Sequence, residues 1–264
     1  MNLWSILNGT IVNVVTVALG SLIGLSISAK LSERYRSIVL TTLGLVTITL
    51  GMDASVLKFS DTVAQFQPLM GGDGTYGARL ALVVIGSLLV GVILGTALDL
   101  QGRIEALGTW IHGRFSVQNP KSFTEGFLTA SVIFCVGPLT LLGCLQNGAH
   151  GDPSYLYIKA LLDGFCSLAL ASALGWGVFA SVLTVLSFQG GLSLIAYAAA
   201  EPLDELSIGL MTSVGGVVLL ATALMILDLK KIPVANMLPA IFLPPLVIKL
   251  SEWVAPGLLL PPAG

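Results

Sequence analysis

Lys159 and Asp163 are the two residues whose types and spacing point most directly to chemistry. They stand four residues apart in a stretch, 155–174, that is otherwise uncharged, so an α-helix places both on one face. Ionised groups inside a membrane are costly unless paired or wetted, which makes such a pair a candidate functional site. With Asp152 as N-cap and Pro153 as first helical residue, Asp163 lies about 16 Å along the helix, near a bilayer midplane. Asp163 is then either a substrate- or proton-coupling group that Lys159 tunes, or a structural partner of Lys159.

Gly137 and Pro138 interrupt a second apolar stretch, 126–145. Proline has no backbone donor and disfavours helical geometry in the residue before it, so carbonyl groups near Phe134 are expected to lose their helical hydrogen bonds. Two interpretations follow. These carbonyls and Thr140 either bind a small substrate or ion, or they belong to an ordinary proline kink packed by a neighbouring helix.

Asn13 and Asn236 are polar residues near the starts of two further apolar stretches. Each amide is able to hydrogen-bond another helix. They either line a cavity or hold helices together, the commoner role of asparagine inside a membrane.

The composition places these residues in a membrane protein. Of the 264 residues 55% are hydrophobic and only 10% are charged, whereas a soluble domain needs about 25% charged residues to cover its surface. The mean hydropathy is +0.94. A formal net charge of -2 without a basic patch argues against nucleic-acid binding. These values exclude a cytosolic enzyme and a disordered linker protein.

Motifs of the common enzyme classes are absent from the sequence. It contains no GxxxxGK[ST] loop for ATP phosphates and no HExxH zinc motif, and His112 and His150 both fall in expected loops. Cys135, Cys144 and Cys166 lie in apolar stretches without CxxC spacing. We therefore expect no enzyme activity, no cofactor, no metal and no disulfide framework.

The charge-free stretches predict an all-α polytopic membrane protein with about eight transmembrane helices. A bilayer core about 30 Å thick requires about 20 helical residues. The uncharged run 164–200 would be roughly 55 Å long as one helix, so it is expected to fold back at Gly175-Trp176-Gly177. The expected spans are 9–29, 37–52, 80–98, 126–145, 155–174, 178–200, 207–227 and 235–250.

The distribution of lysine and arginine predicts the orientation, because cytoplasmic loops are enriched in both. Placing the N-terminus outside leaves Lys58, Arg79 and Lys249 on the outer side. The inner side then holds Lys30, Arg34, Arg36, Arg103, Arg114, Lys121, Lys230 and Lys231. Residues 1–264 are expected to form one integral domain of the cell (inner or plasma) membrane, with an outer loop at 53–79 and an inner amphipathic segment at 101–121.

A faint internal similarity suggests two inverted halves. Thr41-Thr42-Leu43-Gly44 resembles Thr212-Ser213-Val214-Gly215 at an offset of 171 residues, and the same offset pairs Gly20 with Gly191. Spans one to three would then pair with spans six to eight. A shift of five spans reverses the direction of crossing, which is the arrangement of many transporters.

Short motifs spread over nearly the whole chain carry a family resemblance: Asn8-Gly9-Thr10, Gly20-Ser21-Leu22-Ile23-Gly24, Glu125-Gly126-Phe127, Gly148, Gly151-Asp152-Pro153, Lys159-Ala160-Leu161-Leu162-Asp163, Gly215-Gly216 and Asn236-Met237-Leu238-Pro239-Ala240. Through them the chain resembles the YqgA/YdfK-like bacterial membrane proteins, a family of unknown function, nearly from end to end. Two departures are the segment 53–79, which is longer than usual, and Asp99, where relatives often carry glutamate. The resemblance implies a multi-spanning inner-membrane protein without an assigned activity.

These observations favour a secondary transporter of a small solute or ion, because an ATP site is missing while one carboxylate is deeply placed. The expected binding residues are Asp163, Lys159, Gly137, Pro138, Thr140, Asn13 and Asn236. A passive channel, formed as a homo-oligomer through glycine-rich helix faces, and a non-transporting scaffold that docks a partner on residues 101–121 are the alternatives. The expected partners are the lipid bilayer and a small-molecule or ion substrate.

Overall fold

Every regular element in the described part of the chain is a helix. The computed structural model describes residues 2–28, 33–103, 106, 120–136, 138–198 and 204–260. The elements are α1 (Leu3–Ser28), α2 (Glu33–Met52), η1 (Asp53–Leu57), α3 (Lys58–Phe66), η2 (Pro68–Met70), α4 (Tyr76–Ala97), α6 (Pro120–Val136), α7 (Pro138–His150), α8 (Ser154–Leu174), α9 (Trp176–Ala180), α10 (Val182–Ala198), α11 (Glu205–Ile226), η3 (Val234–Phe242) and α12 (Leu243–Val254).

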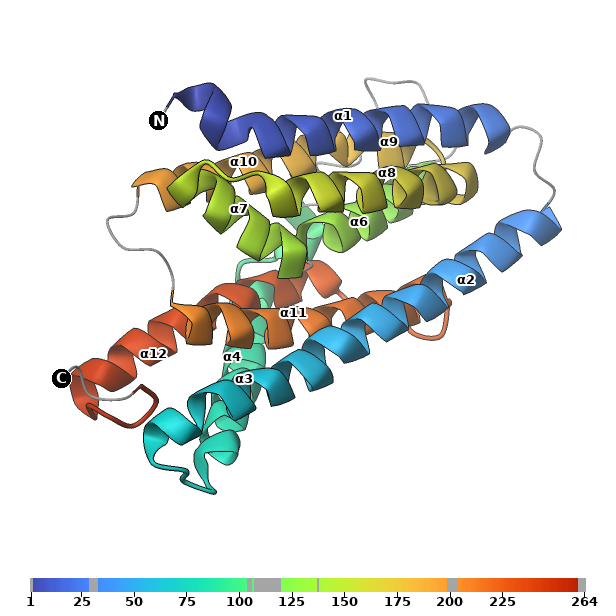
Figure 1. Ribbon diagram of the computed structural model, residues 1–264. Coiled ribbons are helices and arrows are strands. Elements are labelled where there is room, and N and C mark those ends of the chain that lie inside the picture. Colours follow the sequence, from blue (N-terminus) through green and yellow to red (C-terminus); the bar gives the residue numbers. More distant parts are fainter. Residues whose placement is uncertain are drawn as a thin grey trace.

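The helices lie in two layers (Figure 1). One layer contains α1 and α6 to α10, and the other contains α2 to α4, α11, η3 and α12. Helix α11 is the most buried of the membrane-length helices. It packs against α2 and η3 in its own layer and against α6 and α7 in the other, so it joins the two layers.

Six of the described helical stretches are long and apolar enough to cross a membrane: Leu3–Ile27, Tyr76–Ala97, Ser154–Leu174, Trp176–Ala198, Glu205–Ile226 and Val234–Val254. The expected count of eight is not confirmed. The stretch 126–145 is divided between α6 and α7, which have 17 and 13 residues. Residues 37–52 lie within α2, several of whose side chains are outside the described residues, and the uncharged helix between Arg36 and Asp53 is about 24 Å long.

The break at Gly175 is confirmed. Helix α8 ends at Leu174 and α9 begins at Trp176, and Gly175 between them has φ 79°. Such a left-handed conformation is inexpensive for glycine alone, because other residues carry a Cβ. The chain reverses direction there, so α10 returns along the layer toward the end where α8 begins (Figure 1).

The sequence predicted a loop at 53–79, but this segment is largely helical. Element η1 continues α2 directly, and α3 and η2 follow before the glycine turn at Gly71 and Gly72. Phe66 is buried with Tyr76, Leu206 and other apolar residues, so α3 folds back onto the protein. The run Gly71-Gly72-Asp73-Gly74 is typical of a turn, and the predicted loop was extended from it over this short helix. Most of the expected amphipathic segment 101–121 falls outside the described residues.

Helices α1 and α8 pack closely through glycines. A Cβ on Gly20 would lie 2.2 Å from the carbonyl oxygen of Gly164, and one on Gly24 would lie 2.3 Å from that of Leu168. The two helices run parallel, because Gly20 and Gly24 meet successive positions of α8 in the same order. This contact sets α1 against the helix that carries Lys159 and Asp163.

Candidate functional site

The Lys159–Asp163 pair lies in the interior of the first layer. The two side chains, one turn apart on α8, form an ion pair, and Lys159 and Asp163 are only 4% and 7% exposed. Helix α8 begins at Ser154 rather than at Pro153, so Asp163 is about 14 Å along it. The Lys159 ammonium lies 6.0 Å from the centre of the Phe134 ring of α6, at the outer limit of a cation–π contact.

Asn13 of α1 connects this pair to a third membrane-length helix. Its Nδ2 donates one hydrogen bond to Asp163 Oδ2 at 2.9 Å and a second to Gln189 Oε1 of α10 at 3.2 Å. Asn13 and Gln189 are both fully buried. Three helices therefore meet at one polar network, held by charge on α8 and by amides on α1 and α10.

Part of this network has unused hydrogen-bonding capacity. Asn13 Oδ1, Gln189 Nε2 and Thr10 Oγ1 are buried without a hydrogen-bond partner among the described residues. An unsatisfied buried polar atom costs about 1–3 kcal/mol, and most such atoms in proteins are bonded. Two facing helices thus keep an acceptor, a donor and a hydroxyl at this place.

The broken helix borders the pair and supplies no open carbonyl at Phe134. The Phe134 carbonyl lies four residues before Pro138, which has no backbone N–H to donate to it. Thr140 Oγ1 donates a hydrogen bond to this carbonyl instead, at 3.0 Å. Thr140 is fully buried. Gly137 lies outside the described residues, as does the side chain of Pro138. Thr140 therefore supplies a donor to the carbonyl whose helical N–H donor is missing at Pro138.

Asn236 lies in the other layer, away from this network. Its Oδ1 accepts a hydrogen bond from the Gln101 backbone N–H at 2.8 Å, and Gln101 Oε1 accepts one from the Ala235 N–H at 3.1 Å. A Cβ on Gly95 would lie 2.0 Å from the Asn236 carbonyl oxygen. Asn236 therefore fastens the end of α4 to the start of η3.

The structure brings Asn13, Lys159 and Asp163 together, sets Thr140 at the neighbouring helix break and leaves Asn236 apart. Sequence reasoning missed Gln189 and Thr10. Gln189 is an amide within the uncharged run 164–200, and a polar residue at membrane depth is the signal that would have singled it out.

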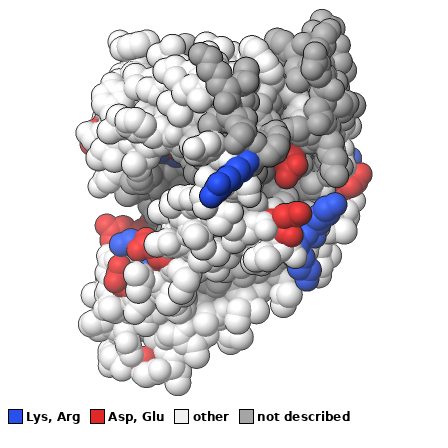
Figure 2. All heavy atoms as spheres, turned by 90° about the vertical axis from the view of Figure 1, so that its right-hand side faces the viewer, with Lys and Arg blue, Asp and Glu red and all other residues white. Residues whose placement is uncertain are grey.

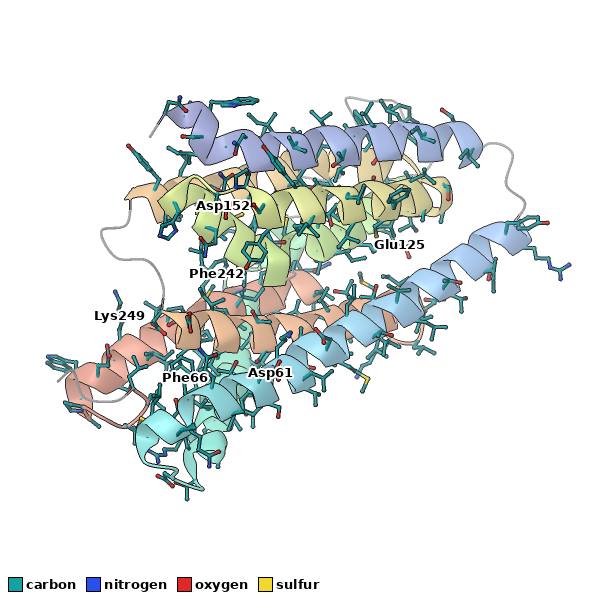
Figure 3. All side chains as sticks on the ribbon, viewed as in Figure 1. Asp61, Phe66, Glu125, Asp152, Phe242 and Lys249 are labelled. Carbon is teal, nitrogen blue, oxygen red and sulfur yellow. The ribbon has the colours of Figure 1, made fainter. Side chains whose placement is uncertain are left out.

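Along the described membrane-length helices, the charged side chains other than Lys159 and Asp163 lie near the helix ends. Figure 3 places Asp152 and Lys249 toward one end of the molecule and Glu125 toward the other. In the end-on view of Figure 2, the described surface carries scattered charges of both signs among uncharged residues. Asp152 accepts hydrogen bonds from the Ser154 hydroxyl and backbone N–H, which hold the pKa of its carboxyl below the ordinary 3.8.

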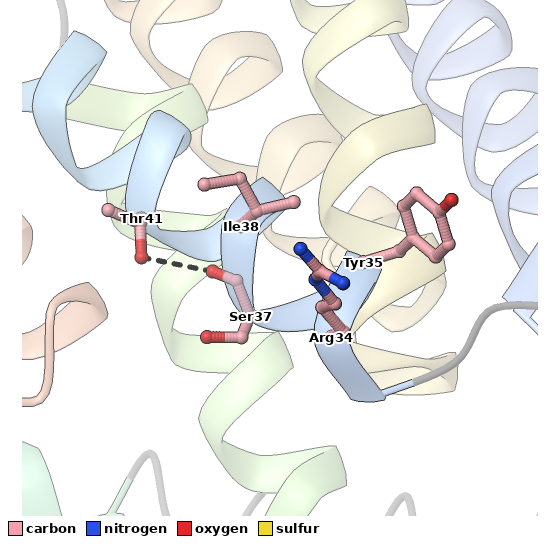
Figure 4. Close-up of a pocket in the computed structure, with 5 residues that line it drawn as sticks. All are labelled: Arg34, Tyr35, Ser37, Ile38 and Thr41. Carbon is pink, nitrogen blue, oxygen red and sulfur yellow. Dashed lines mark hydrogen bonds between the residues drawn. The ribbon is translucent and has the colours of Figure 1, made fainter.

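A cavity of about 620 Å³ lies at the start of α2 (Figure 4). The described residues that line it, none of which belongs to the buried network, are Arg34, Tyr35, Ser37, Ile38 and Thr41. Among the described residues, no group of three His, Cys, Asp or Glu side chains is placed to hold a metal ion.

Comparisons with known proteins agree on one family. Residues 8–249 match the family described as "Protein of unknown function (DUF554)". The chain is 33% identical to the uncharacterized membrane protein YdfK of Bacillus subtilis over 240 residues, 91% of this chain and 95% of the relative. It is 30% identical to the uncharacterized protein YqgA of Escherichia coli over 255 residues, 94% of this chain and 99% of the relative. No solved structure matches the chain.

Proposed function

The chain belongs to the DUF554 family of proteins of unknown function, and on this premise we propose that it is a secondary transporter of a small solute or ion. The observation that carries the proposal is the buried Lys159–Asp163 pair in the middle of a membrane-length helix, contacted by Asn13 from α1, which also binds Gln189 of α10. The proposal assigns no catalytic activity and no cofactor to the protein.

The cost of the ion pair is the reason to assign it a role. Replacing a buried pair by apolar residues of similar volume is often neutral or stabilising, so such a pair is weak evidence of a purely structural purpose. Ionisable groups inside membrane helices commonly mark substrate or proton pathways. Asp163 is proposed as the coupling or substrate-binding group, with Lys159 tuning its charge and Asn13 orienting it.

The packing of the helices supports an inverted repeat as part of this proposal. The expected repeat partners lie in contact: α1 with α10, α2 with α11, and α4 with η3. The pair α4 and η3 is antiparallel, because Gly91 meets Ala240 while Gly95 meets Asn236. We propose that α2 and the broken α6–α7 helix complete eight spans of the inner or plasma membrane, with the N-terminus outside.

A flux assay tests the proposal. The purified chain is reconstituted into vesicles, and uptake of labelled metabolites and inorganic ions is measured with and without imposed proton and sodium gradients. Asp163→Asn and the charge-balanced Lys159→Gln/Asp163→Asn variant are expected to lose gradient-driven uptake. Asp61→Asn, which changes an exposed aspartate of α3, should retain it.

The outcomes separate the alternatives. Conductance without ion coupling would indicate a channel. A channel formed by an oligomer that packs through Gly20 and Gly24 of α1 is disfavoured, because α8 of the same chain already covers these glycines. Absence of flux, with a phenotype lost on deletion of residues 101–121, would indicate a scaffold. A charge-balanced variant that transports normally would show that the pair is structural.

A further inference from the structure

The charges of the buried network cancel. Lys159 and Asp163 bear opposite charges and are paired with each other. The neighbouring groups named above are uncharged amides, hydroxyls and an aromatic ring: Asn13, Gln189, Thr10, Thr140 and Phe134. An ion bound here would leave an uncompensated charge in a low-dielectric interior, and that state is strongly unfavourable.

The unused hydrogen-bonding groups form a complementary set. Asn13 Oδ1 accepts, Gln189 Nε2 donates and the Thr10 hydroxyl does either, and all three belong to fully buried side chains. Asn13 and Gln189 are bonded to each other, so the free acceptor and the free donor lie close together on the facing helices α1 and α10. A ligand that satisfies both must itself donate and accept hydrogen bonds.

The positions of these groups also indicate the end of the molecule from which a solute would reach Asp163. Thr10 lies one turn from Asn13 toward the start of α1, and Lys159 lies one turn from Asp163 toward the start of α8. Because α1 and α8 are parallel, both lie on the side of Asp163 that faces the end bearing Asp152 (Figure 3). The polar groups therefore lead from that end to the carboxylate.

We infer that the site between α1, α8 and α10 takes a small, net-neutral polar solute that both donates and accepts hydrogen bonds, rather than a free inorganic ion. The inference names the substrate class of the proposed transporter and rests on that proposed function. Amide-bearing and zwitterionic solutes belong to this class, because each presents a donor and an acceptor without net charge.

Small probes of similar size test the inference in the purified full-length chain. Acetamide and glycine are net-neutral with a donor and an acceptor, acetone is neutral with an acceptor only, and sodium acetate and methylammonium chloride supply an anion and a cation. A ligand that binds the folded state raises the melting temperature by mass action. Acetamide or glycine should raise it in the wild type more than acetone or the two salts do, measured against equal sodium chloride.

Matched variants locate the effect. Gln189→Leu should abolish the shift, whereas Gln65→Leu, the same change at an exposed glutamine of α3, should retain it. If Gln189→Leu does not fold, Thr10→Val removes a hydroxyl of the same set and should reduce the shift. The inference is overturned if acetate or methylammonium is the strongest stabiliser, if acetone equals acetamide, if Gln189→Leu keeps the full shift, or if neither neutral probe acts.

The experiments distinguish a failure of this inference from a failure of the proposed function. Ion uptake that requires the Lys159–Asp163 pair, without binding of a neutral probe, would preserve the transporter and refute the neutral substrate class. Neutral-probe binding that is lost in Gln189→Leu, without any flux, would preserve the site and refute transport.

Discussion

Neutralising Asp163 alone should destabilise the protein far more than neutralising Asp163 and Lys159 together. Asp163→Asn leaves the Lys159 ammonium buried beside uncharged neighbours, and Lys159→Gln leaves the Asp163 carboxylate in the same position. The double variant Lys159→Gln/Asp163→Asn removes both charges and keeps side chains of similar size. The difference between these variants measures how strongly the two charges depend on each other.

The expected magnitude follows from the burial of the pair. The side chains of Lys159 and Asp163 are 5% and 10% exposed, so solvent screens their interaction little. Removing one partner of a buried pair costs about 3–5 kcal/mol of unfolding free energy. For a chain of this length that corresponds to a fall of roughly 6–20 °C in melting temperature. The double variant should lie within about 1 kcal/mol of the wild type, because no unpaired charge remains.

The assay is a thermal or denaturant unfolding series of the detergent-purified variants, analysed as a double-mutant cycle. Lys58 and Asp61 form an exposed ion pair with side chains 51% and 69% exposed, and they provide the control cycle. That cycle should give a coupling of about 0–1 kcal/mol. Additive losses at Lys159 and Asp163, or single variants as stable as the wild type, would refute the buried-pair reasoning.

Three further predictions concern helix packing, the broken helix and acid stability. Gly20→Ala should cost about 1–3 kcal/mol of unfolding free energy because its Cβ meets the α8 backbone. Gly191→Ala adds a Cβ in open space and should not destabilise the protein. Equal melting temperatures of the two variants would contradict this packing. Thr140→Val should cost about 1–3 kcal/mol by leaving a buried carbonyl unbonded, and Thr222→Val, whose hydroxyl bonds within an intact helix, should cost less in the same unfolding series. Because hydrogen bonds lower the pKa of Asp152, the stability it contributes is present above its ordinary pKa of 3.8 and is lost as the pH falls through its folded pKa. Melting curves of Asp152→Asn against pH should lack that part of the acid dependence, and an unchanged pH profile would exclude it.

Features that depend on local chemistry could be predicted from the sequence. The i, i+4 spacing placed Lys159 and Asp163 on one helix face, and Pro138 marked the carbonyl of Phe134 as one without its helical donor. Gly175 was predicted as part of a turn because the uncharged run 164–200 is too long for a single crossing of a bilayer. Each of these inferences needs only a few neighbouring residues.

The number of membrane spans did not follow from the uncharged stretches alone. Residues 37–52 lie in α2, several of whose side chains are outside the described residues, and the stretch 126–145 is divided between α6 and α7, so neither is among the six described membrane-length helices. In segment 53–79, which was predicted as a loop, α3 was missed because its nine residues are stabilised by packing on α11 and α4.

By itself the sequence predicted a helical membrane protein with Lys159 and Asp163 on one face of a membrane helix, because hydropathy and charge placement are properties of the chain. Only the tertiary structure decided that Asn13 and Gln189 join Asp163 while Asn236 fastens α4 to η3. The physical reason is that lipid tails are as apolar as leucine, so a membrane helix shows little hydrophobic periodicity to mark its buried face. Which polar residues meet is set by close contacts such as that of Gly20 with Gly164, which join residues far apart in the chain.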